Sequence, residues 1–165
     1  MRRVLIITFI ICALASALPA RADEGKSFKG CIKDFKAVIK EVRAYMTKYR
    51  EEQKEIKLLA ECIYWENWYT DSKKRAAYLT GAVVMNRVNS EEWPGTVKDV
   101  LYQKGQYSTT KYFFTQELPS EVYDLAKDIY YNGTDDVPAN VVFQATFSQG
   151  KLFEKVNGEY FCYGR

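Results

Sequence analysis

Residues 73–88, KKRAAYLTGAVVMNRV, decide the fold. Small and aliphatic side chains occupy nearly every face of a helix drawn through this stretch: Ala76, Ala77, Leu79, Gly81, Ala82, Val83, Val84 and Met85. A helix that lacks a polar face has to be covered on all sides. Asp71 and Ser72 supply cap-type side chains just before it. The stretch therefore predicts a buried central helix around which the other elements pack.

Two helical segments are predicted before this central helix. In the first, apolar side chains recur at alternating steps of three and four residues: Ile32, Phe35, Ile39, Val42, Met46 and Tyr49. This amphipathic helix either packs on its own domain or serves as a coiled-coil or partner-binding arm. The second segment covers about 55–68, and the charged run 50–55 before it is a solvated turn or helix face.

Helix signals continue after the central helix. Thr96 can cap a short helix that follows the break at Trp93-Pro94-Gly95, and Pro119 opens a helix that extends to about residue 131. Residues 104–116, which lie between these helices, are rich in glutamine, serine, threonine and aromatic residues without a sustained period. We interpret them as a long, functional loop.

The character of the chain changes near its C-terminus. The runs 141–143 and 160–163 are β-prone, and Asn157-Gly158 is a strong turn signal just before the second run. The predicted fold class is therefore α+β, mostly α, with a small C-terminal β element.

The N-terminus has the pattern of a secretory signal peptide. Arg2 and Arg3 precede a nearly uninterrupted apolar stretch, residues 4–17, which is too short to span a bilayer comfortably. Residues 20–22, Ala-Arg-Ala, then offer a cleavage site. We expect residues 1–22 to be removed and the protein to be secreted, to the extracellular space or the cell wall; an uncleaved anchor is the alternative.

The composition excludes several kinds of site. Histidine is absent from all 165 residues, which excludes His-ligated zinc, Ser-His-Asp triads and Cys-His pairs; we expect no metal and no cofactor. The excess of 24 Lys and Arg over 21 Asp and Glu is due to the three arginines in residues 1–22, so no nucleic-acid partner is implied. Cys31, Cys62 and Cys162 remain, and either a disulfide of Cys62 with one of the others or buried thiols would fit.

Glu66 is the strongest candidate for acid–base chemistry. It extends an apolar stripe at positions i, i+3, i+4 and i+7, whose earlier members are Leu59, Cys62 and Ile63. Aromatic residues flank it in the sequence: Tyr64, Trp65, Trp68 and Tyr69. Burial there would raise the pKa of the carboxyl above its ordinary range, as a proton donor near neutral pH requires. The alternative is a glutamate at a helix end that faces solvent or forms a salt bridge.

Aromatic residues in the 104–116 loop indicate a ligand surface. Tyr and Trp rings stack on sugar rings, although rings at helical spacing more often belong to a core. The loop rings lie beside Gln106 and Ser108 and are Tyr107, Tyr112, Phe113 and Phe114. They would suit a polar, hydroxyl-rich ligand as well as they would suit packing.

Four motifs stand in order between residues 58 and 108: Tyr64-Trp65-Glu66, Asn86-Arg87-Val88, Trp93-Pro94-Gly95-Thr96-Val97 and Gln106-Tyr107-Ser108. In order and spacing this stretch resembles the SleB/CwlJ-type cell-wall hydrolases, the spore-cortex-lytic enzyme family. A weaker match, residues 141–144 and 156–163, is similar to the family's terminal hairpin. The resemblance covers about 56–163.

The resemblance implies a lysozyme-like domain over 56–165, after the signal peptide 1–22 and a helical extension 23–55. It implies cleavage of peptidoglycan glycan strands between N-acetylmuramic acid and N-acetylglucosamine, similar to lytic transglycosylases, with Glu66 as the single catalytic glutamate. The residues expected to contact the substrate are Gln106, Tyr107, Ser108, Gln144, Tyr160, Trp65 and Trp68.

The chain also departs from the family pattern. Where the family commonly has Glu-Ala-Arg-Gly-Glu, this chain has Glu66-Asn67-Trp68-Tyr69-Thr70, and the histidines often found near the C-terminus are absent. An ordinary hydrolase would need a second carboxylate, for which Asp71 is the nearest in sequence. The alternative function is a catalytically silent module that binds the cell wall or regulates a partner through the 31–55 helix.

Overall fold

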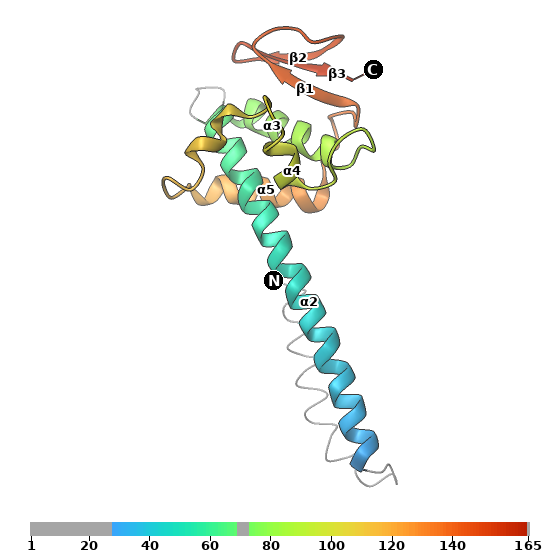
Figure 1. Cartoon of the computed structure of the whole chain (residues 1–165). Helices are drawn as coiled ribbons and strands as arrows, with labels where there is room; N and C mark the ends of the chain where they lie inside the picture. Colours follow the sequence, from blue (N-terminus) through green and yellow to red (C-terminus); the bar gives the residue numbers. More distant parts are fainter. Residues whose placement is uncertain (1–27, 69–72, 165) are drawn as a thin grey trace. The chain divides into compact units, whose positions relative to one another are not determined.

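The structure is a computed structural model that describes residues 28–68 and 73–164 (Figure 1). The predicted signal peptide, Tyr69 and the predicted cap residues Asp71 and Ser72 lie outside the described residues. The chain divides into two units, residues 1–49 and 50–165. Within the described ranges, no helix combines the length and the apolar character that a membrane crossing requires.

The two helical segments predicted before the central helix are parts of one helix, α2 (Phe28–Ile63). The charged run 50–55 is a helix face and not a turn, since the chain has neither glycine nor proline between residues 31 and 63 to end the helix. In the first unit, part of the apolar stripe is exposed, including Phe35 and Met46. A π-helical turn, η1 (Tyr64–Trp68), follows α2.

Helix α3 (Lys73–Val88) is the buried central helix that the sequence predicts. One face, with Ala77 and Val84, packs in a core shared with the other helices, and another, with Leu79 and Val83, packs in a core shared with the C-terminal sheet. A Cβ atom at Gly81 would lie 2.6 Å from Ile129 Cδ1 and 3.0 Å from Ile63 Cδ1, so a larger residue at this position would require these side chains to move.

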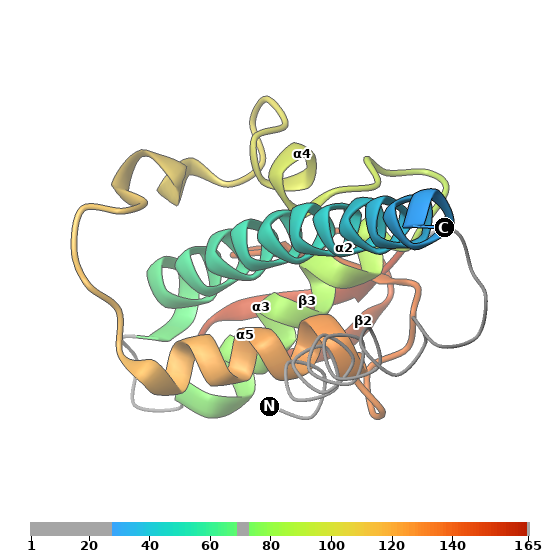
Figure 2. The ribbon, with the colours of Figure 1, turned by 90° about the horizontal axis from the view of Figure 1, so that it is seen from below.

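The remaining helices follow the predicted signals. Thr96 caps the short helix α4 (Val97–Leu101), and its hydroxyl oxygen accepts a hydrogen bond from Asp99 N at 3.1 Å. The predicted loop contains a short 3₁₀ helix, η2 (Ser108–Tyr112). Helix α5 (Ser120–Asn132) ends at Gly133, whose φ is +74°. Figure 2 shows α5 beside α3, with the sheet beyond α3.

The C-terminal element is a three-stranded antiparallel sheet in the order β1-β3-β2, made of β1 (Val141–Ala145), β2 (Leu152–Val156) and β3 (Glu159–Tyr163). The fold class, α+β and mostly α, is confirmed. The predicted turn joins β2 to β3, with positive φ at Asn157 and Gly158. Strand β2 was not predicted, because charged residues interrupt its apolar pattern.

Candidate active site

A polar cavity of about 130 Å³, here called the Glu66 pocket, lies where the helices meet the sheet. Its walls come from η1, α3, the loop before η2, and strands β1 and β3. The lining residues are Glu66, Arg87, Gln106, Tyr107, Gln144, Ala145, Thr146 and Glu159. Residues far apart in the sequence therefore converge on one small cavity that is rich in hydrogen-bonding groups.

The π-turn sets the position of Glu66. Leu59, Cys62 and Ile63 are fully buried as the stripe predicts, whereas Glu66 is only partly buried. The helix widens to a π-helix directly after Ile63, and π-helical turns occur frequently at functional sites. Asn67 anchors the turn, because its Nδ2 donates to Thr80 Oγ1 at 2.8 Å and to Glu159 Oε2 at 2.9 Å.

Burial raises the pKa of Glu66 above its ordinary value, in the direction that the sequence predicts. The hydroxyl of Thr109 donates a hydrogen bond to Glu66 Oε1, which lowers the pKa, and the nearby carboxylate of Glu159 raises it. Desolvation is the largest of the three effects, so the net shift of the Glu66 pKa is upward.

The cysteine chemistry near Glu66 is that of buried thiols. Cys62 and Cys162 are both free and buried, which decides against a disulfide between them, while the side chain of Cys31 lies outside the described residues. Desolvation raises the pKa of the Cys62 thiol well above its ordinary value, and the Glu66 charge adds to this. Cys62 is therefore a neutral neighbour of Glu66 and not a nucleophile.

Glu159 is a second carboxylate at the pocket that the sequence analysis missed. Its Oε2 accepts hydrogen bonds from Asn67 Nδ2 at 2.9 Å and from Gln144 Nε2 at 2.7 Å. The turn at Asn157-Gly158 predicts that a strand begins near Glu159, but no signal in the sequence brings that strand to Glu66.

Arg87 joins three of the sequence motifs. Its side chain is buried, its Nε donates to Val142 O at 2.7 Å and its Nη1 donates to Gln106 Oε1 at 2.9 Å. The guanidinium lies 4.3 Å from the ring centroid of Trp93 and 5.5 Å from that of Tyr107, which are cation–π distances. Arg87 thus fixes the loop that carries Gln106 and Tyr107 against β1.

Two polar atoms of this pocket are buried without a hydrogen-bond partner in the described part of the chain: the Tyr107 hydroxyl oxygen and Gln144 Oε1. Burial raises the pKa of Tyr107, so its hydroxyl keeps its proton and stays a donor. Buried polar atoms are nearly always hydrogen-bonded, and an exception calls for an explanation. The residues that line the pocket therefore include one donor and one acceptor whose hydrogen-bonding capacity is unused among the described residues.

Four of the predicted site residues meet at this pocket: Glu66, Gln106, Tyr107 and Gln144. The other four lie elsewhere. Ser108 is exposed, and the Tyr160 hydroxyl accepts a hydrogen bond from Lys155 Nζ at 2.8 Å. The Trp65 indole donates to Glu61 Oε2 at 3.1 Å, and Trp68 lines a different cavity.

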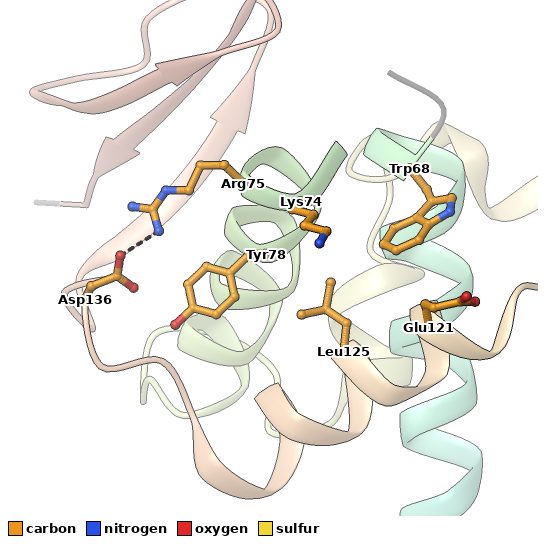
Figure 3. A pocket seen from close by; sticks show the side chains of 7 residues that line it. All are labelled: Trp68, Lys74, Arg75, Tyr78, Glu121, Leu125 and Asp136. Carbon is orange, nitrogen blue, oxygen red and sulfur yellow. Dashed lines mark hydrogen bonds and ion pairs between the residues drawn. The ribbon is translucent and has the colours of Figure 1, made fainter. Parts of the chain in front are cut away.

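This second cavity, the Trp68 pocket, has a volume of about 560 Å³ and a mainly apolar lining. Figure 3 shows its residues on η1, α3, α5 and the loop before β1: Trp68, Lys74, Arg75, Tyr78, Glu121, Leu125 and Asp136. Arg75 Nη1 donates to Asp136 at 2.6 Å, and its Nε and Nη2 both donate to Glu154. The Arg75 guanidinium of this pocket is therefore already paired with carboxylates of the protein.

Among the described residues, no group of three or more His, Cys, Asp or Glu side chains is arranged to hold a metal ion. The chemical groups available in the Glu66 pocket are a carboxyl group with a raised pKa, a second carboxyl group, a buried guanidinium and two amide side chains.

Comparison with known proteins identifies a matching family. The family model described as Cell Wall Hydrolase matches residues 71–160, which include every lining residue of the Glu66 pocket except Glu66 itself. No curated protein and no solved structure matches. The match covers more than half of the chain and confirms the resemblance to the SleB/CwlJ-type family. The chain therefore belongs to the cell wall hydrolase family and is an enzyme that acts on peptidoglycan.

Proposed function

We propose that this enzyme cleaves peptidoglycan glycan strands between N-acetylmuramic acid and N-acetylglucosamine as a lytic transglycosylase, with Glu66 as its single general acid and base. The observation that carries the proposal is the partly buried Glu66 carboxyl, with a raised pKa, at the wall of a polar pocket. General acid catalysis needs a donor that is still protonated near the working pH.

In the first half of the reaction, the protonated Glu66 gives its proton to the glycosidic oxygen and the bond to C1 of the muramic sugar breaks. The Thr109 hydroxyl donates to Oε1 of Glu66, which leaves Oε2 to carry the proton. An oxocarbenium-like centre develops at C1 in this step. The Glu159 carboxylate lines the same pocket, and its negative charge would stabilise a positive centre that develops there.

In the second half, the Glu66 carboxylate removes the proton from the muramic C6 hydroxyl while O6 bonds to C1. Glu66 regains its proton, no water is consumed, and the product has a 1,6-anhydro end. This route needs one acid–base group and not the nucleophile or water-activating base of an ordinary glycosidase. Asp71, the earlier candidate for such a second group, lies outside the described residues.

The location of the substrate supports secretion as part of the proposal. Peptidoglycan lies outside the cytoplasmic membrane, and residues 1–22 have the pattern of a cleaved signal peptide. We expect the mature enzyme to begin near residue 23.

Mass spectrometry of the products from purified peptidoglycan tests the proposal. Fragments with 1,6-anhydro muramic ends are the expected result. Ordinary reducing ends would contradict the transglycosylase mechanism and indicate hydrolysis. Binding of the protein to peptidoglycan without any fragments would contradict catalysis and favour the silent wall-binding module.

A further inference from the structure

We propose that the Glu66 pocket binds a secondary amide, the 2-acetamido group of an N-acetylated sugar, between the Gln144 side-chain oxygen and the Tyr107 hydroxyl. The inference rests on the proposed function for the kind of polymer, since both sugars of peptidoglycan glycan strands carry this group. The inference goes further by naming the two groups through which the pocket would distinguish an N-acetylated sugar from a sugar with a hydroxyl at the same position.

The orientation of Gln144 follows from its neighbour. The Glu159 carboxylate can only accept hydrogen bonds, so the amide nitrogen of Gln144, 2.7 Å away, has to face it. The amide oxygen, Oε1, is then left as a buried acceptor without a partner among the described residues. Glu159 therefore acts as a positioning residue that turns the acceptor of Gln144 toward the ligand.

Tyr107 supplies the complementary donor. Its side chain is 8% exposed, and its hydroxyl is buried at the same pocket without a partner in the described ranges. Contact with the Arg87 guanidinium, whose own donors bind Val142 O and Gln106, holds the ring in place. One acceptor and one donor are the complement of a secondary amide, whose N–H donates and whose C=O accepts.

The size of the cavity favours a terminal group. A volume of about 130 Å³ accommodates a small substituent but not a disaccharide, so the sugar ring itself would lie outside. Peptidoglycan offers a second source of secondary amide in the lactyl–peptide linkage of muramic acid. That amide continues into a peptide, whereas the acetamido group ends in a methyl and fits a small pocket.

Binding of soluble tetrasaccharides tests the proposal without depending on turnover. The two probes are the β-1,4-linked tetramer of N-acetylglucosamine and cellotetraose, which has hydroxyls in place of the acetamido groups. Titration calorimetry with the Glu66→Gln protein is expected to give at least about tenfold tighter binding of the N-acetylated tetramer. Equal affinity for the two probes would overturn the proposal.

Two tyrosine variants in the Glu66→Gln background locate the effect. Tyr107→Phe is expected to reduce the preference roughly three- to tenfold by weakening only the N-acetylated probe. Tyr102→Phe, which alters an exposed ring outside the pocket, is the matched control and is expected to keep the full preference. A preference that Tyr107→Phe leaves intact, or an equal loss for both probes, would contradict the proposal.

Thermal stability and a third probe test two alternatives: a structural role for the Tyr107 hydroxyl, and the lactyl–peptide amide as the ligand. Tyr107→Phe removes an unpaired buried hydroxyl, so its melting temperature is expected to match or exceed that of the parent; a marked decrease would indicate a structural role and overturn the proposal. The N-acetylglucosamine tetramer has no lactyl or peptide group. If only muropeptides that carry stem peptides bind in a Tyr107-dependent manner, the lactyl–peptide amide is the ligand and the acetamido assignment fails.

Discussion

The Glu66 pocket and the Trp68 pocket both begin at the π-turn η1, and they differ in chemistry. Glu66 and Trp68 are two residues apart, so a helical turn directs their side chains to different sides. The Trp68 pocket is the larger and more apolar, and its arginine is paired with carboxylates of the protein. The smaller Glu66 pocket holds two carboxylates and two buried polar atoms without a partner in the described chain. The Glu66 pocket is therefore the better candidate for the reaction site, although it is the smaller of the two.

The largest expected difference between the pockets is in turnover. Glu66→Gln keeps the shape of the side chain but removes the transferable proton, so we expect peptidoglycan cleavage to fall about 10²- to 10⁴-fold. Trp68→Ala, made in the other pocket, is expected to change turnover by no more than about threefold. The rate at which soluble fragments are released from labelled peptidoglycan measures the turnover of both variants. A similar loss of turnover in the two variants would contradict the assignment of the reaction to the Glu66 pocket.

Glu159→Gln is expected to have the next largest effect, seen in the pH profile. Activity falls on the alkaline side as Glu66 loses its proton. The Glu159 charge raises the pKa of Glu66, so its removal lowers that pKa and moves the alkaline limb to lower pH. Cys62 and Tyr107, also near Glu66, are kept neutral by burial, and the Arg87 charge is present in both proteins.

The matched control for this profile keeps the Glu159 charge and breaks one of its hydrogen bonds. Gln144→Ala removes the donor to Glu159 Oε2 and is expected to leave the alkaline limb close to its wild-type position. If Gln144→Ala moved the limb as far as Glu159→Gln does, Glu159 would act through structure and not through its charge.

Thr109→Val is expected to move the same limb in the opposite direction, by a smaller amount. The Thr109 hydroxyl lowers the pKa of Glu66, so replacing it by an isosteric methyl raises that pKa and extends activity to higher pH. The measurement is again the rate against pH. A shift to lower pH would show that the hydroxyl does not stabilise the charged carboxylate.

The smallest effect is expected in the Trp68 pocket. Arg75→Ala removes the ion pairs with Asp136 and Glu154, whose side chains are partly exposed to solvent. Exposed pairs contribute little, so the free energy of unfolding should fall by about 1 kcal/mol, with turnover unchanged. Denaturant unfolding measures the free energy of unfolding. A large loss of peptidoglycan cleavage in Arg75→Ala would indicate that the Trp68 pocket takes part in the reaction.

The sequence predicted those helices and turns whose formation depends on residues close together in the chain. The apolar stretch 73–88 predicted the central helix because such a helix has to be covered on both sides, as α3 is by helices and sheet. Asn157-Gly158 predicted the β2–β3 turn because both residues accept positive φ. The unbroken length of α2 was missed, since a charged run can be a turn or a helix face. Strand β2 was missed because it lacks an alternating pattern.

The site was only partly predictable, since most of its contacts join distant residues. The stripe from Leu59 to Ile63 identified Glu66, although the π-turn changes the spacing at that point. No pattern along the chain could show that Glu159 lines the same pocket as Glu66, or that Thr109 donates a hydrogen bond to Glu66. Sequence proximity to Glu66 also suggested Trp68 as a substrate contact, but the helical turn directs it to another cavity.

The most direct test of the central claim is the titration of Glu66 itself. In a protein labelled with ¹³C at the glutamate carboxyl carbons, the Glu66 signal can be assigned by its absence from the Glu66→Gln spectrum. Burial beside Glu159 predicts a titration midpoint above the ordinary value of 4.5. A midpoint at or below 4.5 would mean that the carboxyl is ionised near neutral pH and would contradict its role as the proton donor.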